Sequence, residues 1–144
     1  GSIGTMAIQL AKHAGAEVTA VCSSRNFDMV TSLGADKVID YTHDDAIAQL
    51  EHYDWVLDTV GNKKTSPLKD ASQTALTTNG QYLSVDKGTP TTSRDKFLRV
   101  KELAEQGVLK PIIDRCYSLD EMVEAHKYVE TGHKRGNVIV TIGR

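Results

Sequence analysis

The spacing of hydrophobic residues alternates along the chain between a pattern typical of strands and a pattern typical of helices. Short runs rich in β-branched residues predict strands or extended segments at 17–22, 37–41, 54–59, 81–85, 109–114 and 137–142. Apolar residues at helical spacing predict helices over 1–14, 26–33, 44–51, 67–77, 94–106 and 119–130. Strands that alternate with helices through short loops are typical of a parallel sheet covered on both faces. We therefore expect the α/β class, with a doubly wound parallel sheet.

Local patterns sharpen three of these elements. The first helix carries one apolar stripe, made of Ile3, Ala7, Leu10, Ala11 and Ala14. The helix over 94–106 has its apolar residues on one face, namely Phe97, Val100, Leu103 and Ala104. Trp55 lies inside a predicted strand, so we expect it in the core. Ser118 and Glu121 have the spacing of a capping box, which predicts the start of the helix over 119–130.

The composition excludes several classes of protein. The 144 residues are 40% hydrophobic and 25% charged, which suits one domain with a real core. A net charge of −2 gives no basic surplus for nucleic acid, and no apolar run approaches the roughly 18 residues of a membrane span. The sequence opens on glycine and a helical pattern rather than on a signal peptide. We therefore expect a cytoplasmic protein that binds neither nucleic acid nor a membrane.

The metal-ligating residue types are scattered. Cys22 and Cys116 lie far apart, so we interpret them as two reduced thiols rather than a disulfide or zinc pair. The histidines show no i, i+4 metal pair; they are His13, His43, His52, His126 and His133. The sequence predicts no metal site, and the histidines are interpreted as surface or capping residues.

The first chemical motif is Gly1-Ser2-Ile3-Gly4, which opens a predicted helix. A dinucleotide pyrophosphate needs bare backbone that can approach it and the positive end of a helix beneath it. Two glycines alone equally suit an ordinary turn before any helix. The strand that follows in the same unit favours a Rossmann-type phosphate loop.

The second motif follows the strand at 17–22. Domains specific for NAD place an acidic residue there to bind the ribose 2′-hydroxyl, whereas this chain has Ser23-Ser24-Arg25. Two hydroxyls and a guanidinium suit a 2′-phosphate, so the motif predicts NADPH. Tyr41, at the end of the next strand, is a candidate for the same phosphate or the adenine. The alternatives are a plain polar loop and a half-buried structural tyrosine.

Two later strand ends are candidates for the other half of the cofactor. Ligands of a doubly wound sheet sit beyond the carboxyl ends of the strands. Thr59, Val60, Gly61 and Val85 should therefore face the ribose and nicotinamide, and Gly61 allows backbone close to the ring. We interpret Asp58 as a structural residue that binds loop amides.

The C-terminal region offers one weaker candidate. Asn137 is placed to reach a ligand, whereas Lys134-Arg135 before it is interpreted as a solvated turn. No residue of the chain is convincing as a proton donor, so we assign no catalytic residue.

The order of three blocks is highly specific: GSIGTMAIQLAKHAGAEVTAVCSS, then SLGADKVIDYT, then DWVLDTVG. They closely resemble the cofactor domain of medium-chain dehydrogenases/reductases, quinone-oxidoreductase branch, which are often labelled zinc-type alcohol dehydrogenases. The later stretch KELAEQGVLKPIIDRCYSLDEMVEAHKYVETGHKRGNVIV resembles that family's C-terminal part. The resemblance implies NADPH-dependent reduction of quinones or α,β-unsaturated carbonyls without catalytic zinc. By the same match, Gly1 and Gly4 are the last glycines of the phosphate loop, and the residues around the adenosine phosphate are Ser23, Ser24, Arg25 and Tyr41.

The resemblance also implies that this chain is a fragment. The family's N-terminal catalytic domain and the first, central strand of its nucleotide fold have no counterpart here. Losing that strand exposes edges of the runs EVTAVC and DWVLDT. Either a longer parent chain supplies the strand from upstream, or these runs pair with each other or with a second copy. We expect a nucleotide-binding domain over 1–107 and a C-terminal return segment with the last strand over 108–144.

These expectations combine into one function. The chain is the NADPH-binding part of an oxidoreductase that transfers hydride to a small quinone or α,β-unsaturated carbonyl, with a homodimer left open. One rival interpretation is a non-catalytic NADPH-binding module or sensor. Another is a remnant of a nucleotide fold that serves only in assembly.

Overall fold

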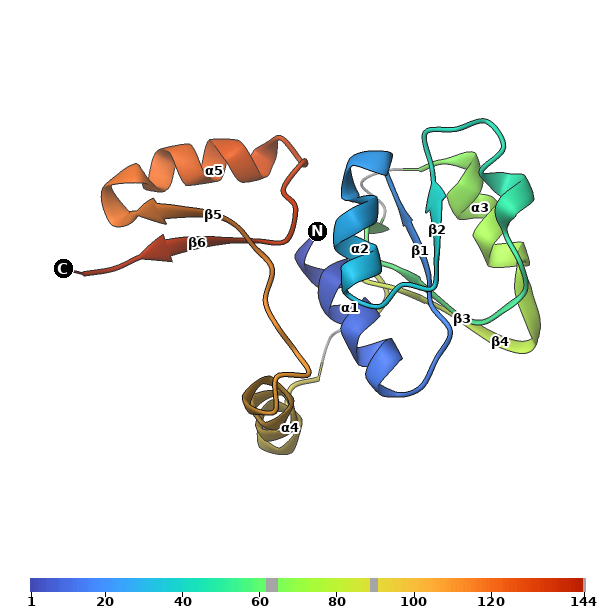
Figure 1. The fold of residues 1–144 in the computed structure, drawn as a ribbon, viewed down its shortest axis with the longest axis horizontal. Coiled ribbons are helices and arrows are strands. Elements are labelled where there is room, and N and C mark those ends of the chain that lie inside the picture. Colours follow the sequence, from blue (N-terminus) through green and yellow to red (C-terminus); the bar gives the residue numbers. More distant parts are fainter. Residues whose placement is uncertain (62–64, 89–90, 144) are drawn as a thin grey trace.

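The computed structural model describes residues 1–61, 65–88 and 91–143 (Figure 1). Its helices are α1 (Ser2–His13), α2 (Phe27–Ser32), α3 (Pro67–Thr74), α4 (Arg94–Glu105) and α5 (Met122–Glu130). Its strands are β1 (Thr19–Cys22), β2 (Lys37–Asp40), β3 (Tyr53–Asp58), β4 (Leu76–Ser84), β5 (Ile113–Ser118) and β6 (Asn137–Thr141). Short 3₁₀ turns are η1 (Ser24–Asn26), η2 (Ile47–Gln49) and η4 (Leu119–Glu121). The alternation confirms the predicted α/β class.

The strands pair two by two, and each pair is parallel. β1 pairs with β2, β3 with β4, and β5 with β6. The first pair has an unbroken register from Thr19 opposite Lys37 to Cys22 opposite Asp40. Within the described residues, β1 and β3 are not hydrogen-bonded neighbours, so the sheet is divided at the place where the sequence predicted a missing strand. Direct pairing of the two runs is therefore not what the structure shows.

The core consists of two small clusters. One joins α1, β1 and α2 through Ile8, Ala20, Val30 and Ala35, and the other joins β2 to α3 through Ile39, Ala46 and Leu68. The residues that α1 buries are Thr5, Ile8 and Gln9. Its apolar stripe lies largely outside these clusters, with Ile3 51% and Leu10 40% exposed. The apolar face of α1 is thus turned toward the division of the sheet.

Trp55 is not in the core. Its side chain is 61% exposed, and its strand neighbour Leu57 is 47% exposed. Alternate residues of a strand share a face, so Trp55 and Leu57 lie on the same face of β3, and their exposure shows that the described residues do not cover this face with a second layer. The expectation that Trp55 is buried was therefore wrong.

The segment 44–51 is not the predicted α-helix. It contains only the 3₁₀ turn η2, and its backbone bonds span three residues, as in Ala46 N–H to the His43 carbonyl at 3.2 Å. Asp40 competes for the backbone here, because its carboxylate accepts from the Thr42 amide at 2.9 Å and from the Thr42 hydroxyl at 2.7 Å. Side-chain to backbone bonds of this kind favour turns over helix.

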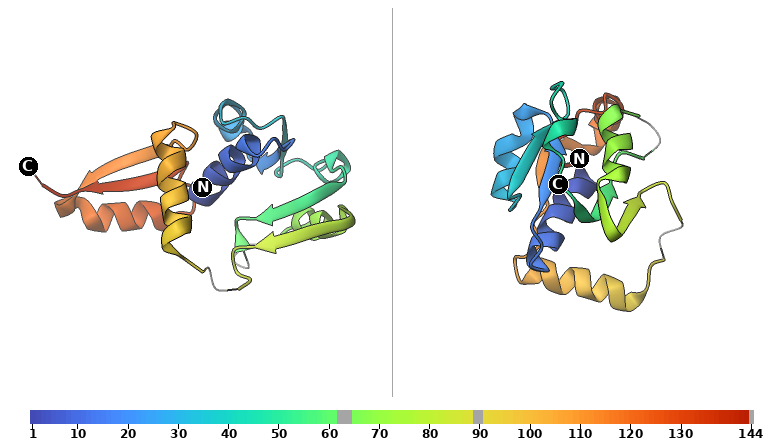
Figure 2. Two further views of the ribbon diagram at one scale, coloured as in Figure 1. Left: turned by 90° about the horizontal axis from the view of Figure 1, so that it is seen from below. Right: turned by 90° about the vertical axis from the view of Figure 1, so that its right-hand side faces the viewer.

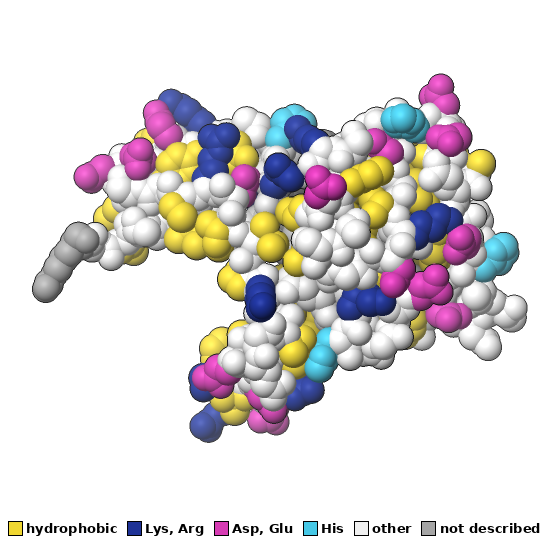
Figure 3. All heavy atoms as spheres, in the orientation of Figure 1, with side chains coloured by type: hydrophobic (Ala, Val, Ile, Leu, Met, Phe, Trp, Pro, Cys, Tyr) yellow, Lys and Arg dark blue, Asp and Glu magenta, His cyan; other side chains and the backbone are white. Residues whose placement is uncertain are grey.

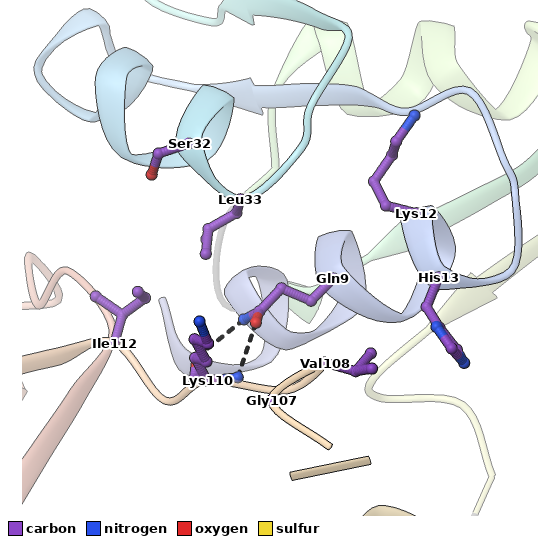
Figure 4. A pocket seen from close by; sticks show the side chains of 9 residues that line it. All are labelled: Gln9, Lys12, His13, Ser32, Leu33, Gly107, Val108, Lys110 and Ile112. Carbon is purple, nitrogen blue, oxygen red and sulfur yellow. Dashed lines mark hydrogen bonds between the residues drawn. The ribbon is translucent and has the colours of Figure 1, made fainter. Parts of the chain in front are cut away.

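The segment after α4 begins its strand later than predicted. Gln9 of α1 accepts from the Lys110 amide at 2.8 Å and donates to the Lys110 carbonyl at 3.0 Å (Figure 4). These bonds engage the Lys110 backbone before β5 begins at Ile113. The pair lies in an open pocket of about 460 Å³ and fastens the C-terminal segment to α1.

The C-terminal elements form an arm in which α5 packs on β5 and β6 (Figures 1 and 2). The predicted capping box is confirmed, with Ser118 and Glu121 bonded reciprocally before α5. Hydrophobic side chains lie on the surface of the arm, among them Val123 at 63% exposure (Figure 3). Of the predicted apolar face of α4, only Leu103 is buried. None of the helices in the described ranges is long and apolar enough to cross a membrane.

Candidate functional site

The amino end of α1 carries the predicted phosphate loop. Gly1 is the N-cap, and the helix runs for 12 residues from Ser2. A Cβ placed on Gly4 would lie 3.6 Å from the Thr59 hydroxyl, so the loop after β3 borders this helix end. The structure thus brings Gly1, Ser2, Ile3 and Gly4 together with Thr59. Free backbone amides at such an end favour a bound anion.

The Ser23-Ser24-Arg25 motif follows β1, and Tyr41 follows the paired strand β2. Both strands run in the same direction, so their carboxyl ends lie at the same edge. Asp40 holds this loop, because its carboxylate accepts from the Ser24 amide at 2.9 Å. Hydrogen bonds from Thr42 and Ser24 lower the pKa of Asp40 despite its burial. Arg25 and Tyr41 both remain exposed.

Asp58, the last residue of β3, organises the next loop. One carboxylate oxygen accepts from the amides of Val60 and Gly61, each at 3.0 Å. The other lies 2.8 Å from the Lys69 ammonium and accepts from the Ser84 hydroxyl at 3.2 Å. The interpretation of Asp58 as a structural residue that binds loop amides is confirmed.

The charge of Asp58 is held in a sheltered place. Its side chain is 7% exposed and that of Lys69 is 16% exposed. Burial raises the pKa of Asp58, but the hydrogen bonds from Lys69 and the loop amides lower it further than burial raises it. The same contact raises the pKa of Lys69. The pair is therefore ionised across the neutral range.

The ends of β3 and β4 meet. The Val85 amide donates to the Asp58 carbonyl at 3.1 Å, and Gly61 has a left-handed φ of 69°. A Cβ on Gly61 would meet the Asp86 carboxylate, and the left-handed φ disfavours any residue with a side chain there. The structure therefore groups Val60, Gly61 and Val85 at one edge; that they face the ribose and nicotinamide stays a prediction.

Asn137 lies beside the amino end of α1. Its side-chain amide donates to the Ile112 carbonyl at 3.1 Å, which fixes the start of β6. A groove of about 430 Å³ brings it together with the α1 face and Leu57; its lining is Ser2, Ile3, Met6, Ala7, Leu10, Leu57 and Asn137. Asn137 is thus near the predicted phosphate loop although it is 136 positions after Gly1.

Sequence reasoning missed two parts of this site. It did not find Lys69 as the partner of Asp58, because nothing in the spacing of 11 residues across a loop marks the pair. It also interpreted Lys134 as solvated, whereas its ammonium donates to the Ser2 hydroxyl at 2.9 Å. A signal was present in the run of three basic residues between Gly132 and Gly136.

The described residues do not assemble a metal site. In the ranges 1–61, 65–88 and 91–143, no three side chains of His, Cys, Asp or Glu lie close enough together to hold an ion. Cys22 and Cys116 are both free thiols. These residues do not fit a zinc ion.

The sequence of the chain matches a known family. The sequence profile of zinc-binding dehydrogenases matches residues 2–110, and a second profile of the same description matches residues 87–140. The chain therefore belongs to this family, which is part of the medium-chain dehydrogenases/reductases.

Particular relatives are longer than the chain. It is 32% identical to mouse mitochondrial NAD(P)H oxidoreductase RTN4IP1, covering 99% of this chain and 46% of that protein. It is 30% identical to the chloroplastic NADPH-dependent alkenal/one oxidoreductase of Arabidopsis thaliana, covering 97% of this chain and 38% of that one. The quinone oxidoreductase of Coxiella burnetii superposes with a TM-score of 0.84 at 25% identity, covering 99% of this chain and 50% of that structure. The chain thus spans about half the length of these relatives or less. Their compartments differ, so a cytoplasmic location stays a prediction.

Proposed function

We propose that the chain binds NADPH and forms the cofactor half of an oxidoreductase that reduces a quinone or an α,β-unsaturated carbonyl. The observation that carries the proposal is Ser23-Ser24-Arg25 at the carboxyl end of β1, on the same side of the molecule as the amino end of α1. An acidic residue at that place would repel a 2′-phosphate, whereas Arg25 attracts one. The names of the relatives support the same cofactor and the same classes of substrate.

Different residues are proposed to hold different parts of NADPH. Gly1 to Gly4 and the first amides of α1 hold the pyrophosphate, and Ser23, Ser24, Arg25 and Tyr41 hold the adenosine 2′-phosphate. Thr59, Val60, Gly61, Val85 and Asn137 border the nicotinamide end. When bound, NADPH supplies the hydride, and the chain supplies its position and shelter from water. The site edge formed by β3 and β4 is fixed by Asp58 for that purpose.

Changing Arg25 to Ala is expected to weaken NADPH binding by about tenfold or more, since a charge-assisted bond contributes about 1.5–3 kcal/mol. NADH binding should change by less than about twofold, because NADH lacks the 2′-phosphate that Arg25 contacts. Fluorescence titration of the chain with each cofactor measures both values. Arg94→Ala, which removes the same charge at the start of α4, is the matched control. Equal losses for the two cofactors would contradict the assignment of Arg25.

The chemistry is tested separately by following NADPH oxidation with a panel of quinones and enones. We expect the 144-residue chain to remain below about 1 turnover per second, because it spans only about half the length of its relatives or less and lacks the other half of the cleft. The complete protein that carries this chain should exceed that rate. A fast reaction of the chain alone would refute the proposal that it holds only the cofactor half of the enzyme.

A further inference from the structure

The loop between α5 and β6 lies against the amino end of the chain. In Figure 1 it runs beside the N-terminus and the start of α2. Its residues 133–135 are His-Lys-Arg, and they contact the segments around Ser2 and Arg25, which precede them by more than 100 positions. This loop therefore brings basic side chains to both proposed phosphate positions.

Lys134 reaches the phosphate loop. Its ammonium donates to the Ser2 hydroxyl and to the Gly136 carbonyl, each at 2.9 Å. A Cβ built on Gly1 would lie 3.8 Å from the same nitrogen. Lys134 is half-buried, and its charge is directed at the end of α1.

Arg135 and His133 reach the other position. The Arg135 guanidinium donates to the Asn26 side-chain oxygen at 2.9 Å and to the Arg25 carbonyl at 3.1 Å. The Arg25 guanidinium lies 3.1 Å from His133 Nδ1. Two arginines from opposite ends of the chain are thus held next to each other.

The backbone of this loop is fixed, whereas its basic side chains form no ion pair within the described residues. The Arg135 amide and the Tyr128 hydroxyl donate to one oxygen of Asp114, at 2.8 Å and 2.6 Å. Gly136 has a φ of 119°, and a Cβ there would lie 2.5 Å from the Ile112 carbonyl. Within residues 1–61, 65–88 and 91–143, no ion pair involves Arg25, Lys134 or Arg135.

Asp114 lies near this loop, but it accepts from the Arg135 backbone amide and forms no ion pair with the guanidinium. Basic groups that lie close together without such ion pairs repel one another, so an anion between them is stabilised. We propose that the 133–135 loop completes the phosphate site of NADPH, with Lys134 at the pyrophosphate and Arg135, supported by His133, at the 2′-phosphate. This inference rests on the proposed function and deepens it. It makes Arg135 a determinant of specificity for NADPH over NADH, and Lys134 a determinant of affinity for both.

The test compares two variants against two kinds of ligand. We expect Arg135→Ala to weaken binding of NADPH and of 2′,5′-ADP by about tenfold, and binding of NADH and ADP-ribose by less than about twofold. Lys134→Ala should weaken NADPH, NADH and ADP-ribose by similar factors. Arg99→Ala on α4 and Lys127→Ala on α5 remove the same charges elsewhere and should leave all four affinities unchanged. Arg135→Lys, which keeps the charge, should retain most of the preference.

The outcomes separate this inference from the proposed function. If the chain prefers NADPH and loses the preference in Arg25→Ala but not in Arg135→Ala, the loop assignment is wrong and the function stands. If Arg135→Ala weakens NADPH and NADH equally, with an unchanged thermal midpoint, Arg135 does not read the 2′-phosphate. If the unmodified chain binds no dinucleotide, both proposals are overturned.

Discussion

Asp58→Asn is expected to lower the free energy of unfolding by about 3 kcal/mol at neutral pH, because removing one partner of a buried ion pair leaves the other charge uncompensated. Lys69 would remain 16% exposed beside a neutral amide. The loss is a large share of the roughly 5–15 kcal/mol that stabilises a domain. Urea unfolding of the two chains measures the difference.

The effect of Asp58→Asn should depend on pH in a defined direction. The folded pKa of Asp58 is lowered, so its contribution is complete above the unfolded value of about 4 and is lost as the pH falls. The difference in stability between the two chains should therefore be constant near neutrality and shrink below about pH 4. Asp44→Asn, in the exposed turn after β2, is the control. A difference that grows on acidification would show that Asp58 is not held ionised.

The same variant tests how the loop acts on a ligand. The substituted amide keeps one uncharged acceptor oxygen, so the amides of Val60 and Gly61 lose a charged acceptor, Lys69 loses its ion pair, and the edge at the proposed nicotinamide position loosens. NADPH should then bind more weakly while 2′,5′-ADP, which lacks the nicotinamide, binds as before. Equal changes in affinity for both ligands would show that the substitution disturbs the whole fold and not only the nicotinamide edge.

Much of the fold follows from local pattern. The period of the apolar residues located α1, α2 and β1 to within two residues, because their caps and glycines agree with their periodicity. The helix prediction for segment 44–51 was wrong because the Asp40 carboxylate binds the Thr42 amide and favours a turn. The spacing of hydrophobic residues gives no information on such a contact. The predicted burial of Trp55 was wrong because burial depends on a layer that covers its face of the strand and not on the strand itself.

The candidate site was most readily predicted where consecutive residues of one loop carry it or where strand ends meet at one edge. Ser23, Ser24 and Arg25 are consecutive, so their chemistry is visible in the sequence. The contact between Arg25 and His133 joins residues 108 positions apart, and only the packing of the arm against α1 and α2 creates it. A contact between residues so far apart in the sequence cannot be predicted from their spacing without knowledge of the fold.

Supplying an apolar strand between β1 and β3 is expected to stabilise the chain by about 2–4 kcal/mol, which corresponds to about 5–15 °C in the thermal midpoint. The change is an extension before Gly1 of a five- or six-residue run of Val, Ile and Leu. The groove of about 430 Å³ beside α1 is lined by Ile3, Leu10 and Leu57, which are each about half exposed. A strand laid there covers these three side chains.

Hydrogen bonds support the same position. β1 bonds to β2 and β3 bonds to β4, so within the described residues each of the two inner edges offers backbone donors and acceptors to a new strand. A strand parallel to both would join the two pairs in one sheet, which is the arrangement that the family resemblance predicts. The phosphate loop would then follow directly from the end of that strand.

Two measurements decide this prediction. Thermal unfolding of the extended chain gives the stability, and amide exchange shows where protection increases. We expect slower exchange in β1 and β3 and no change in β5 or β6, because the C-terminal pair lies in a separate sheet. A Gly-Ser extension of equal length is the control and should leave both quantities unchanged.

The groove beside α1 could also be filled by a strand from a second copy of the chain. If a strand from a second copy fills the same groove, the unextended chain should dimerise and already show protected β1 and β3 amides, and the added strand should convert it to a monomer. If the apolar and Gly-Ser extensions give equal midpoints and equal exchange, the groove does not accept a strand. The exposure of Ile3, Leu10 and Leu57 would then need another cause.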